Sequence, residues 1–201
     1  MKRIQLAVFT LIFALTSAVY AAATSPVPML EQTAQQIIST LKQNKTSLKN
    51  NPQLIHQAVQ RYLLPHVDVS GMSRSVLGRQ AWNAASAADR ADFSLAFTQL
   101  VIRTYATPLA AYTDETIKFL PQRSANDGRF TRVSSVIIRS NGQNIPLVYS
   151  LVAKNGQWRI YDLSVEGVSL LQSFHNQFGE ALKNESLREL IAKMGKNSKA
   201  A

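Results

Sequence analysis

The chain contains no cysteine and only three histidines among its 201 residues. Without cysteine no disulfide can form, so the folded state has to be held together by its hydrophobic core. The absence also excludes the lipidated N-terminal cysteine by which lipoproteins are anchored. His56, His66 and His175 show no HExxH motif and no other spacing typical of metal ligands. We therefore expect no metal site, and a structural or surface role for each histidine.

Motifs for catalysis and phosphate binding are missing as well. There is no Gly-x-Ser-x-Gly elbow, and Gly71 and Gly78 are too far apart for a phosphate loop. Asp162 and Glu166 flank the last expected strand and could act as an acid and a base. Such residues more often cap the following helix or pair with arginines. We expect a protein that is not an enzyme and that uses no cofactor.

The first residues indicate export. A charged start, Lys2-Arg3, precedes an apolar run over residues 4–15 and small residues over 18–23. This order is typical of a secretory signal peptide. The run is shorter than the roughly 20 apolar residues that a membrane-spanning helix needs. We predict a signal peptide over residues 1–23, with cleavage after Ala21 or Ala23.

Residues 24–201 are expected to form a single domain, since no linker and no internal repeat divides them. The formal net charge of the whole chain is +10 at pH 7, and removal of Lys2 and Arg3 lowers it by two. A basic exported protein is attracted to anionic surfaces, among which lipid head groups are prominent. Nucleic acid is not expected as a partner, because the positive charges are scattered and no recognition motif accompanies them. Solubility alone explains the charge equally well.

The first half of the chain has helical periodicity. Apolar residues recur at steps of three and four over residues 30–41, 54–63 and 93–112, and a shorter helix or turn is expected over 68–78. Ser86 followed by Asp89 resembles a capping signal for the longest helix. Pro108 should kink or end that helix.

The second half changes to the alternating pattern of strands. Strands are predicted over residues 116–120, 130–139, 145–153 and 158–165, with Asn-Gly turns at 141–142 and 155–156. Helices should follow at 168–183 and 187–194, the second capped by Ser186. The predicted fold class is therefore α+β, with a four-stranded antiparallel meander between N-terminal and C-terminal helices. Helices folded across the concave face of a curved sheet would enclose an apolar pocket.

Several segments, taken in order, resemble one known family. The stretch from Trp158 to Phe178, with Asp162 and the Val165-Glu166-Gly167-Val168-Ser169 break, is similar to the signature of the MlaC family of periplasmic phospholipid-binding proteins, also called toluene-tolerance proteins. Leu64-Pro65-His66-Val67-Asp68, Val76-Leu77-Gly78 followed by Trp82, and the phenylalanine-rich helix resemble further elements of the family. The resemblance covers about residues 30–194.

The resemblance implies an NTF2-like α+β fold and a monomeric periplasmic shuttle that carries phospholipids between the outer and inner membranes. The partners it implies are an inner-membrane ABC transporter complex of the MCE type and an outer-membrane lipoprotein–porin complex. The bound phospholipid would be cargo. Its acyl chains would occupy the pocket, and its head group would stay near the mouth.

Candidate lipid-binding residues come from one wall of the long helix and from the alternating strands. They are Phe97, Leu100, Val101, Tyr105, Ile117, Phe119, Val133, Ile137, Leu147, Tyr149 and Leu151. The break at residues 165–169 is interpreted either as a joint that orients the following helix or as a simple helix start.

Three alternatives remain open at this stage. The protein could carry another apolar cargo, such as a lipoprotein or a sterol-like molecule. It could be an NTF2-like enzyme in which Asp162 or Tyr149 acts inside the pocket. It could also be a structural adaptor with a filled core.

Overall fold

The computed structural model describes residues 25–48, 50–110, 114–121 and 128–196. The expected signal peptide and its cleavage site lie outside these ranges and remain predictions. Tyr112, at the end of the expected stripe of the long helix, also lies outside them. Among the helices of the described ranges, none combines the length and the apolarity that a bilayer crossing requires.

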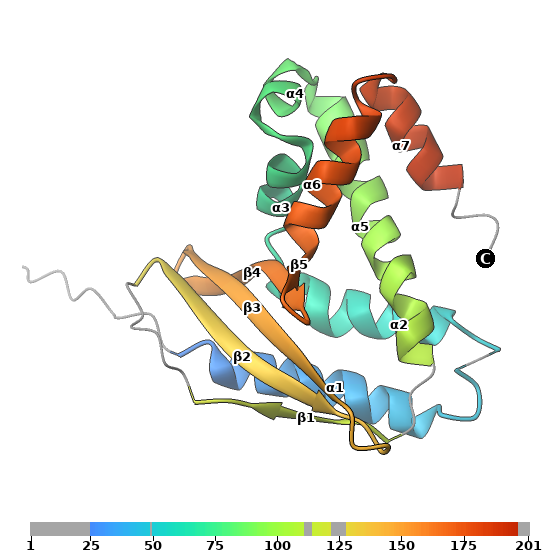
Figure 1. Ribbon diagram of the computed structural model, residues 1–201, viewed down its shortest axis with the longest axis vertical. Helices are drawn as coiled ribbons and strands as arrows, with labels where there is room; N and C mark the ends of the chain where they lie inside the picture. Colours follow the sequence, from blue (N-terminus) through green and yellow to red (C-terminus); the bar gives the residue numbers. More distant parts are fainter. Residues whose placement is uncertain (1–24, 49, 111–113, 122–127, 197–201) are drawn as a thin grey trace, which may run out of the picture.

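Helices come first along the chain, strands follow, and two helices close it (Figure 1). The helical elements are α1 (Val27–Gln43), α2 (Gln53–Ala58), the π-helix η1 (Val59–Leu63), the 3-10 turn η2 (Leu64–His66), α3 (Val69–Leu77), α4 (Arg79–Ala84), α5 (Ala87–Ala110), α6 (Leu170–Ala181) and α7 (Leu187–Lys196). The strands are β1 (Thr116–Phe119), β2 (Phe130–Ile138), β3 (Asn144–Lys154), β4 (Gln157–Val165) and β5 (Val168–Ser169). The α+β class is confirmed.

The sheet is an antiparallel meander in the order β1-β2-β3-β4-β5. The two Asn-Gly turns join β2 to β3 and β3 to β4, as predicted. Asn155 and Gly156 both have positive φ, at 52° and 74°, as a tight two-residue hairpin turn requires.

The expected number of strands is wrong by one. Val168 and Ser169, predicted as the start of a helix, pair with Val165 and Ser164 as the short strand β5. The reason is the turn before them, where Glu166 and Gly167 both have positive φ, at 50° and 84°. This conformation is uncommon for glutamate. The residue types at the turn therefore do not indicate the hairpin between β4 and β5.

The helix caps follow the sequence signals. The Ser86 hydroxyl accepts a hydrogen bond from the Asp89 N–H at 3.0 Å and so caps α5. At α7 the Ser186 hydroxyl accepts from the Glu189 N–H, and the Glu189 carboxylate accepts in return from the Ser186 N–H. This reciprocal pair satisfies two N–H groups at the start of the helix. The described part of α5 extends to Ala110, two residues past Pro108.

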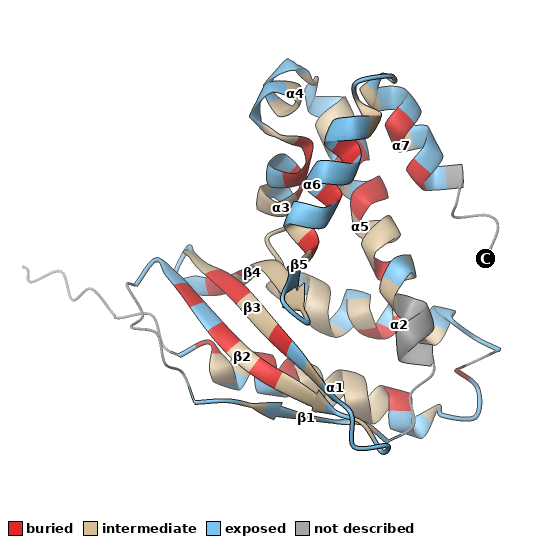
Figure 2. Cartoon of the chain, viewed as in Figure 1, coloured by how far each residue is buried: buried red, intermediate tan, exposed pale blue. Residues whose placement is uncertain are grey.

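Two main groups of buried residues form the core, visible as red segments in Figure 2. The helical cluster joins α3, α5, α6 and α7 and consists of Val76, Leu77, Phe93, Ala96, Phe97, Phe174, Phe178, Leu190 and Met194. The sheet cluster joins α1 to the inner face of the sheet and consists of Leu30, Val133, Leu151, Trp158 and Ile160. A smaller group, Leu41, Leu48 and Ile55, joins α1 to α2.

Candidate functional site

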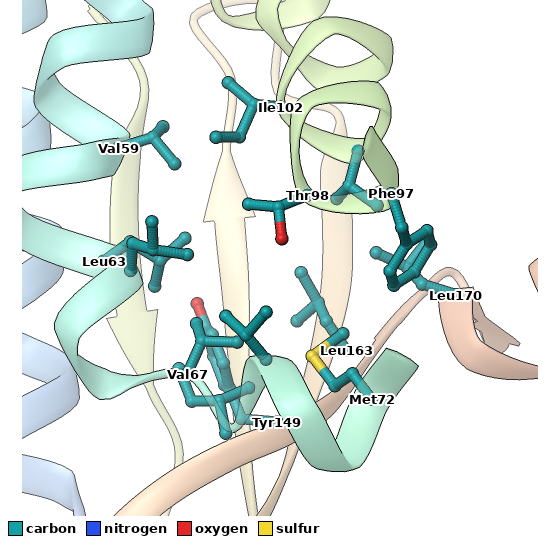
Figure 3. Close-up of a pocket in the computed structure, with 14 residues that line it drawn as sticks. Val59, Leu63, Val67, Met72, Phe97, Thr98, Ile102, Tyr149, Leu163 and Leu170 are labelled. Atoms are coloured by element: carbon teal, nitrogen blue, oxygen red, sulfur yellow. The ribbon is translucent and has the colours of Figure 1, made fainter. Parts of the chain in front are cut away.

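A cavity of about 120 Å³ lies where the helical cluster meets the sheet cluster (Figure 3). Its wall comes from η1, η2, α3, α5, α6, β3 and β4. The lining residues are Val59, Leu63, Leu64, Val67, Val69, Met72, Phe97, Thr98, Val101, Ile102, Tyr149, Ile160, Leu163 and Leu170. Figure 3 shows Val59 and Leu63 facing Thr98 and Ile102 across the space.

Helical spacing explains two sides of the wall. Val59 and Leu63 are four residues apart on the π-helix η1, and Thr98 and Ile102 are four apart on α5. Residues at this spacing project from one side of a helix. The two helical segments therefore present apolar side chains to each other, with the sheet closing the space between them.

A β-bulge brings two residues of β4 to the same wall. Ser150 pairs with Asp162, but Leu151 pairs with Ile160, so Tyr161 has no partner in β3. Side chains normally alternate between the faces of a strand, so residues three apart point to opposite sides. The extra residue cancels this effect, and both Ile160 and Leu163 line the cavity.

Among the described residues on the wall, only Thr98 and Tyr149 carry polar side-chain atoms. The Thr98 hydroxyl donates to the Ser94 carbonyl at 2.7 Å, so it is satisfied within α5. The Tyr149 ring stacks on Phe119 with centroids 5.9 Å apart. Burial raises the pKa of the Tyr149 hydroxyl above its ordinary value, which keeps it neutral at physiological pH. The cavity thus presents a neutral, mostly apolar surface.

Asp162 and Glu166, considered above as an acid and a base, do not line the cavity. The Asp162 carboxylate accepts hydrogen bonds from the Leu163 N–H at 2.9 Å and the Leu171 N–H at 3.1 Å. It also accepts from the Ser169 hydroxyl, which itself caps α6. Glu166 is exposed in the β4–β5 turn. These contacts support the interpretation of the 165–169 break as a joint that orients α6.

A second joint fixes α3 to the same strand. Asp68 is the N-cap of α3, where its carboxylate accepts from the Gly71 N–H at 3.1 Å. Its own N–H donates to the Ile160 carbonyl at 2.8 Å, and its carboxylate pairs with Lys154 at 2.5 Å. The two attachments lie on either side of the bulge at Tyr161, so α3 and α6, two of the helices around the cavity, both start at one short stretch of β4.

The structure places three of the candidate lipid-binding residues on the cavity wall: Phe97, Val101 and Tyr149. Phe119 packs behind the wall through its stack on Tyr149. Val133 and Leu151 are fully buried in the sheet cluster, and Leu100 packs against the helical cluster. Leu147 is buried in β3. Tyr105, Ile117 and Ile137 are half-buried and do not line the cavity.

Most of the wall was not among the candidates. The residues concerned are Val59, Leu63, Leu64, Val67, Val69, Met72, Thr98, Ile102, Ile160, Leu163 and Leu170. The η1 side of the wall could have been predicted, because Val59 and Leu63 belong to the apolar stripe expected over residues 54–63. The contributions of Val67 and Leu163 depend on a loop and a bulge, which periodicity does not reveal.

The histidines lie apart from one another. The His175 Nδ1 is 3.1 Å from the Val76 carbonyl and links α6 to α3. Burial lowers the pKa of His56 and of His66, with a further lowering from Arg103 and Arg159 respectively. Across the described ranges no three His, Asp or Glu side chains are grouped in a way that would hold a metal ion.

An antiparallel sheet, a helical layer and an apolar cavity between them define the class of this protein: an α+β domain with an internal apolar site. The chain belongs to the MlaC family, described as "MlaC protein". The sequence model of that family matches residues 31–196.

Individual relatives agree with this assignment. The chain is 29% identical, over 86% of its length and 82% of the relative's, to the intermembrane phospholipid transport system binding protein MlaC of Haemophilus influenzae. It is 28% identical, over 81% of its length and 75% of the relative's, to the toluene tolerance protein ttg2D of Pseudomonas putida. A solved phospholipid-binding protein from Ralstonia solanacearum, in complex with a phospholipid, has the same fold with a TM-score of 0.77 at 24% identity. That comparison covers 84% of this chain and 94% of the other.

Proposed function

We propose that this protein is a periplasmic carrier that holds a phospholipid by its acyl chains and moves it between the inner and outer membranes. The observation that carries the proposal is the cavity wall, on which nearly every side chain is apolar. The names of the relatives support phospholipid as the cargo. The family further supports an inner-membrane MCE-type ABC transporter and an outer-membrane lipoprotein–porin complex as partners.

The energetics of lipid transfer explain why a carrier needs such a wall. Burial of one methylene group is worth about 0.8 kcal/mol, so exposing two long acyl chains to water costs roughly 20 kcal/mol. An apolar cavity replaces the bilayer interior with a similar environment, so the free energy of the chains changes little on loading or release. Catalytic groups are not required for this task.

The size of the cavity adds one condition. At about 120 Å³ it is smaller than the roughly 300–1,000 Å³ of pockets that enclose drug-sized ligands. A phospholipid with two chains is larger still. We infer that the walls separate when lipid enters and that the described form is the closed one.

The proposal is tested by purifying the full chain without detergent from a diderm bacterium and extracting the bound molecules for mass spectrometry. Intact phospholipid should be recovered. Leu163→Arg, which places a charge on the wall, should abolish recovery because an unpaired charge in an apolar site costs several kcal/mol. Ser164→Arg, at the adjacent residue on the opposite face of β4, should retain the lipid.

Circular dichroism would show whether the Leu163→Arg protein remains folded. If it does not, Leu163→Trp fills the cavity without introducing a charge and should also lower the lipid yield. Recovery of another apolar molecule would redirect the proposal to that cargo. A folded parent protein that neither retains phospholipid nor takes it up from vesicles would refute the carrier function.

A further inference from the structure

The sheet has a second face, turned away from the cavity and from α1. Val133 of β2 points inward and is fully buried in the sheet cluster. Its neighbours Arg132 and Ser134 therefore point outward, together with every second residue of the strand. Figure 1 shows α1 behind β2 and β3, and among the described elements no helix crosses the front of these strands.

This outer face is unusually apolar for a solvated surface. Antiparallel sheets with one face in water normally carry polar residues on that face. Here Phe130 is 42% exposed, Ile138 38% and Leu120 38%. They are three of the five large hydrophobic side chains that are strongly exposed among the described residues. We define the outer face by Lys118, Leu120, Phe130, Arg132, Val136 and Ile138.

Basic side chains alternate with these apolar ones across the strands. Lys118 of β1 lies opposite Val136 of β2. Along β1, Lys118 precedes Leu120, whose N–H donates to the Ser134 carbonyl at 2.9 Å. Along β2, Arg132 lies between the outward residues Phe130 and Ser134. The positive charges are therefore distributed among the exposed hydrophobic residues.

An aromatic pair at one end of the face has a cation beside it. The Phe130 and Tyr161 rings meet edge to face with centroids 6.0 Å apart. The Arg129 guanidinium lies 5.2 Å from the centroid of the Phe130 ring. Tyr161 is the bulged residue of β4, so the bulge that shapes the cavity also contributes to this aromatic pair.

The charge of the face has one sign. Strands β1, β2 and β3 contain no aspartate and no glutamate. On β4, Asp162 is the acidic residue closest in register, and its carboxylate is engaged at the start of α6. Among the described residues no carboxylate pairs with Lys118 or Arg132, so an anionic partner can supply the balancing charge.

We propose that the outer face is a docking surface for membranes that contain anionic phospholipids. Tyrosine side chains such as Tyr161 favour the level of the lipid head groups, with the apolar ring inward and the hydroxyl in water, and the Phe130 ring beside it adds apolar surface. Each lysine or arginine near an anionic bilayer adds about a fivefold gain in affinity. A bilayer surface offers negative charge and apolar depth together at every position, which matches a face on which both kinds of side chain alternate. Docking holds the protein near the bilayer independently of what the cavity contains.

The test is co-sedimentation of the full chain with two kinds of vesicle, pure phosphatidylcholine and phosphatidylcholine mixed with phosphatidylglycerol. The protein should sediment with the mixed vesicles, and added salt should weaken the association because it screens the charges. Arg132→Glu should weaken it by roughly tenfold to thirtyfold, because the reversal removes an attraction and adds a repulsion. Phe130→Ser should also weaken it, through loss of the aromatic contact.

Arg79→Glu is the matched control, since it makes the same charge change at an exposed position of α4. It should bind the mixed vesicles almost as well as the parent protein. If Arg132→Glu does not fold, Lys118→Glu tests the same face. Lipid recovered from the cavity should be unchanged in all these variants, so a failure of docking is distinguishable from a failure of the carrier function.

Three results would overturn the proposal. The first is equal binding to both kinds of vesicle. The second is no binding to the mixed vesicles at low salt, which would indicate a protein partner for this face. The third is an equal loss of binding in Arg79→Glu and Arg132→Glu, which would show that only net charge matters.

Discussion

The Asp162 carboxylate accepts a hydrogen bond from the Ser169 hydroxyl at 2.7 Å. The other oxygen of the same carboxylate accepts from the N–H groups of Leu163 and Leu171. One side chain thereby connects β4 with the first turn of α6. The neighbours Leu163 and Leu170 both line the cavity. Asp162 is therefore a positioning residue that sets how the strand and the helix meet at the wall.

Replacement of Asp162 should weaken this joint in a graded way. Asp162→Ala leaves the Leu171 N–H and the Ser169 hydroxyl without this acceptor, and we expect the free energy of unfolding to fall by about 1–3 kcal/mol. Asp162→Asn keeps one acceptor oxygen and should lose less. Urea denaturation followed by tryptophan fluorescence measures both. The yield of bound phospholipid should follow the same order.

Two results would contradict this role. If Asp162→Ala is as stable as the parent protein, packing of α6 alone holds the joint. If Asp162→Asn is folded and loads lipid but abolishes an enzymatic activity, the carboxylate is a catalytic group after all.

Gly78 offers a test of backbone strain between α3 and α4. Its φ of 80° and ψ of 155° lie in a region that is open almost exclusively to glycine. A Cβ at this position would also lie 3.4 Å from the Cε1 atom of His175. Gly78→Ala should therefore lower the free energy of unfolding by about 1–3 kcal/mol, measured by chemical denaturation.

Gly179 is the matched control, because it lies in the helix α6 with nothing within 4 Å of an added Cβ. Gly179→Ala should raise the stability by about 0.5–1 kcal/mol, since alanine favours the helix. Equal effects of the two substitutions would show that the conformation of Gly78 imposes no special requirement.

The histidines predict how stability depends on pH. Burial lowers the pKa of His56 and of His66 below the ordinary value of 6.5, and Arg103 and Arg159 lower it further. The unfolded chain therefore takes up protons at a higher pH than the folded one. The contribution of the two neutral histidines to the free energy of unfolding is fully present above pH 6.5. It is lost as the pH falls from there through the lowered pKa values.

Thermal unfolding in a series of buffers measures this dependence. The melting temperature should fall as the pH falls from 7 toward 5, above the range in which most carboxylates titrate. The double variant His56→Gln/His66→Gln should give a flatter profile over that interval. An unchanged slope in the double variant would assign the loss of stability to other groups.

Local features of the fold were predictable because neighbouring residues determine them. The two Asn-Gly turns and the Ser186 cap depend on a few adjacent residues, and each was recognised. The β5 strand was not recognised, because Glu166 adopts a positive φ that its residue type seldom shows.

The wall of the cavity was only partly predictable. Phe97, Val101 and Tyr149 belong to regular helix or strand patterns, which show that one side is buried. Val67 comes from a connecting segment that contacts Ile160 of the distant strand β4. No periodic pattern can distinguish a side chain that lines a cavity from one that fills the core, since both are apolar.

The unpaired Tyr161 has a consequence for how this chain can change during evolution. In β4 the inward side chains are spaced by two, then three, then two residues, as at Trp158, Ile160, Leu163 and Val165. Loss of the one extra residue would restore strict alternation and leave Leu163 inward and Asp162 outward. Substitutions at Tyr161 also leave this arrangement intact, whereas insertion of a further residue that continues the alternation would exchange the two surfaces of the second half of the strand. The strand can therefore change or lose its bulged residue without exchanging its two surfaces, but it cannot gain a paired residue in the same way.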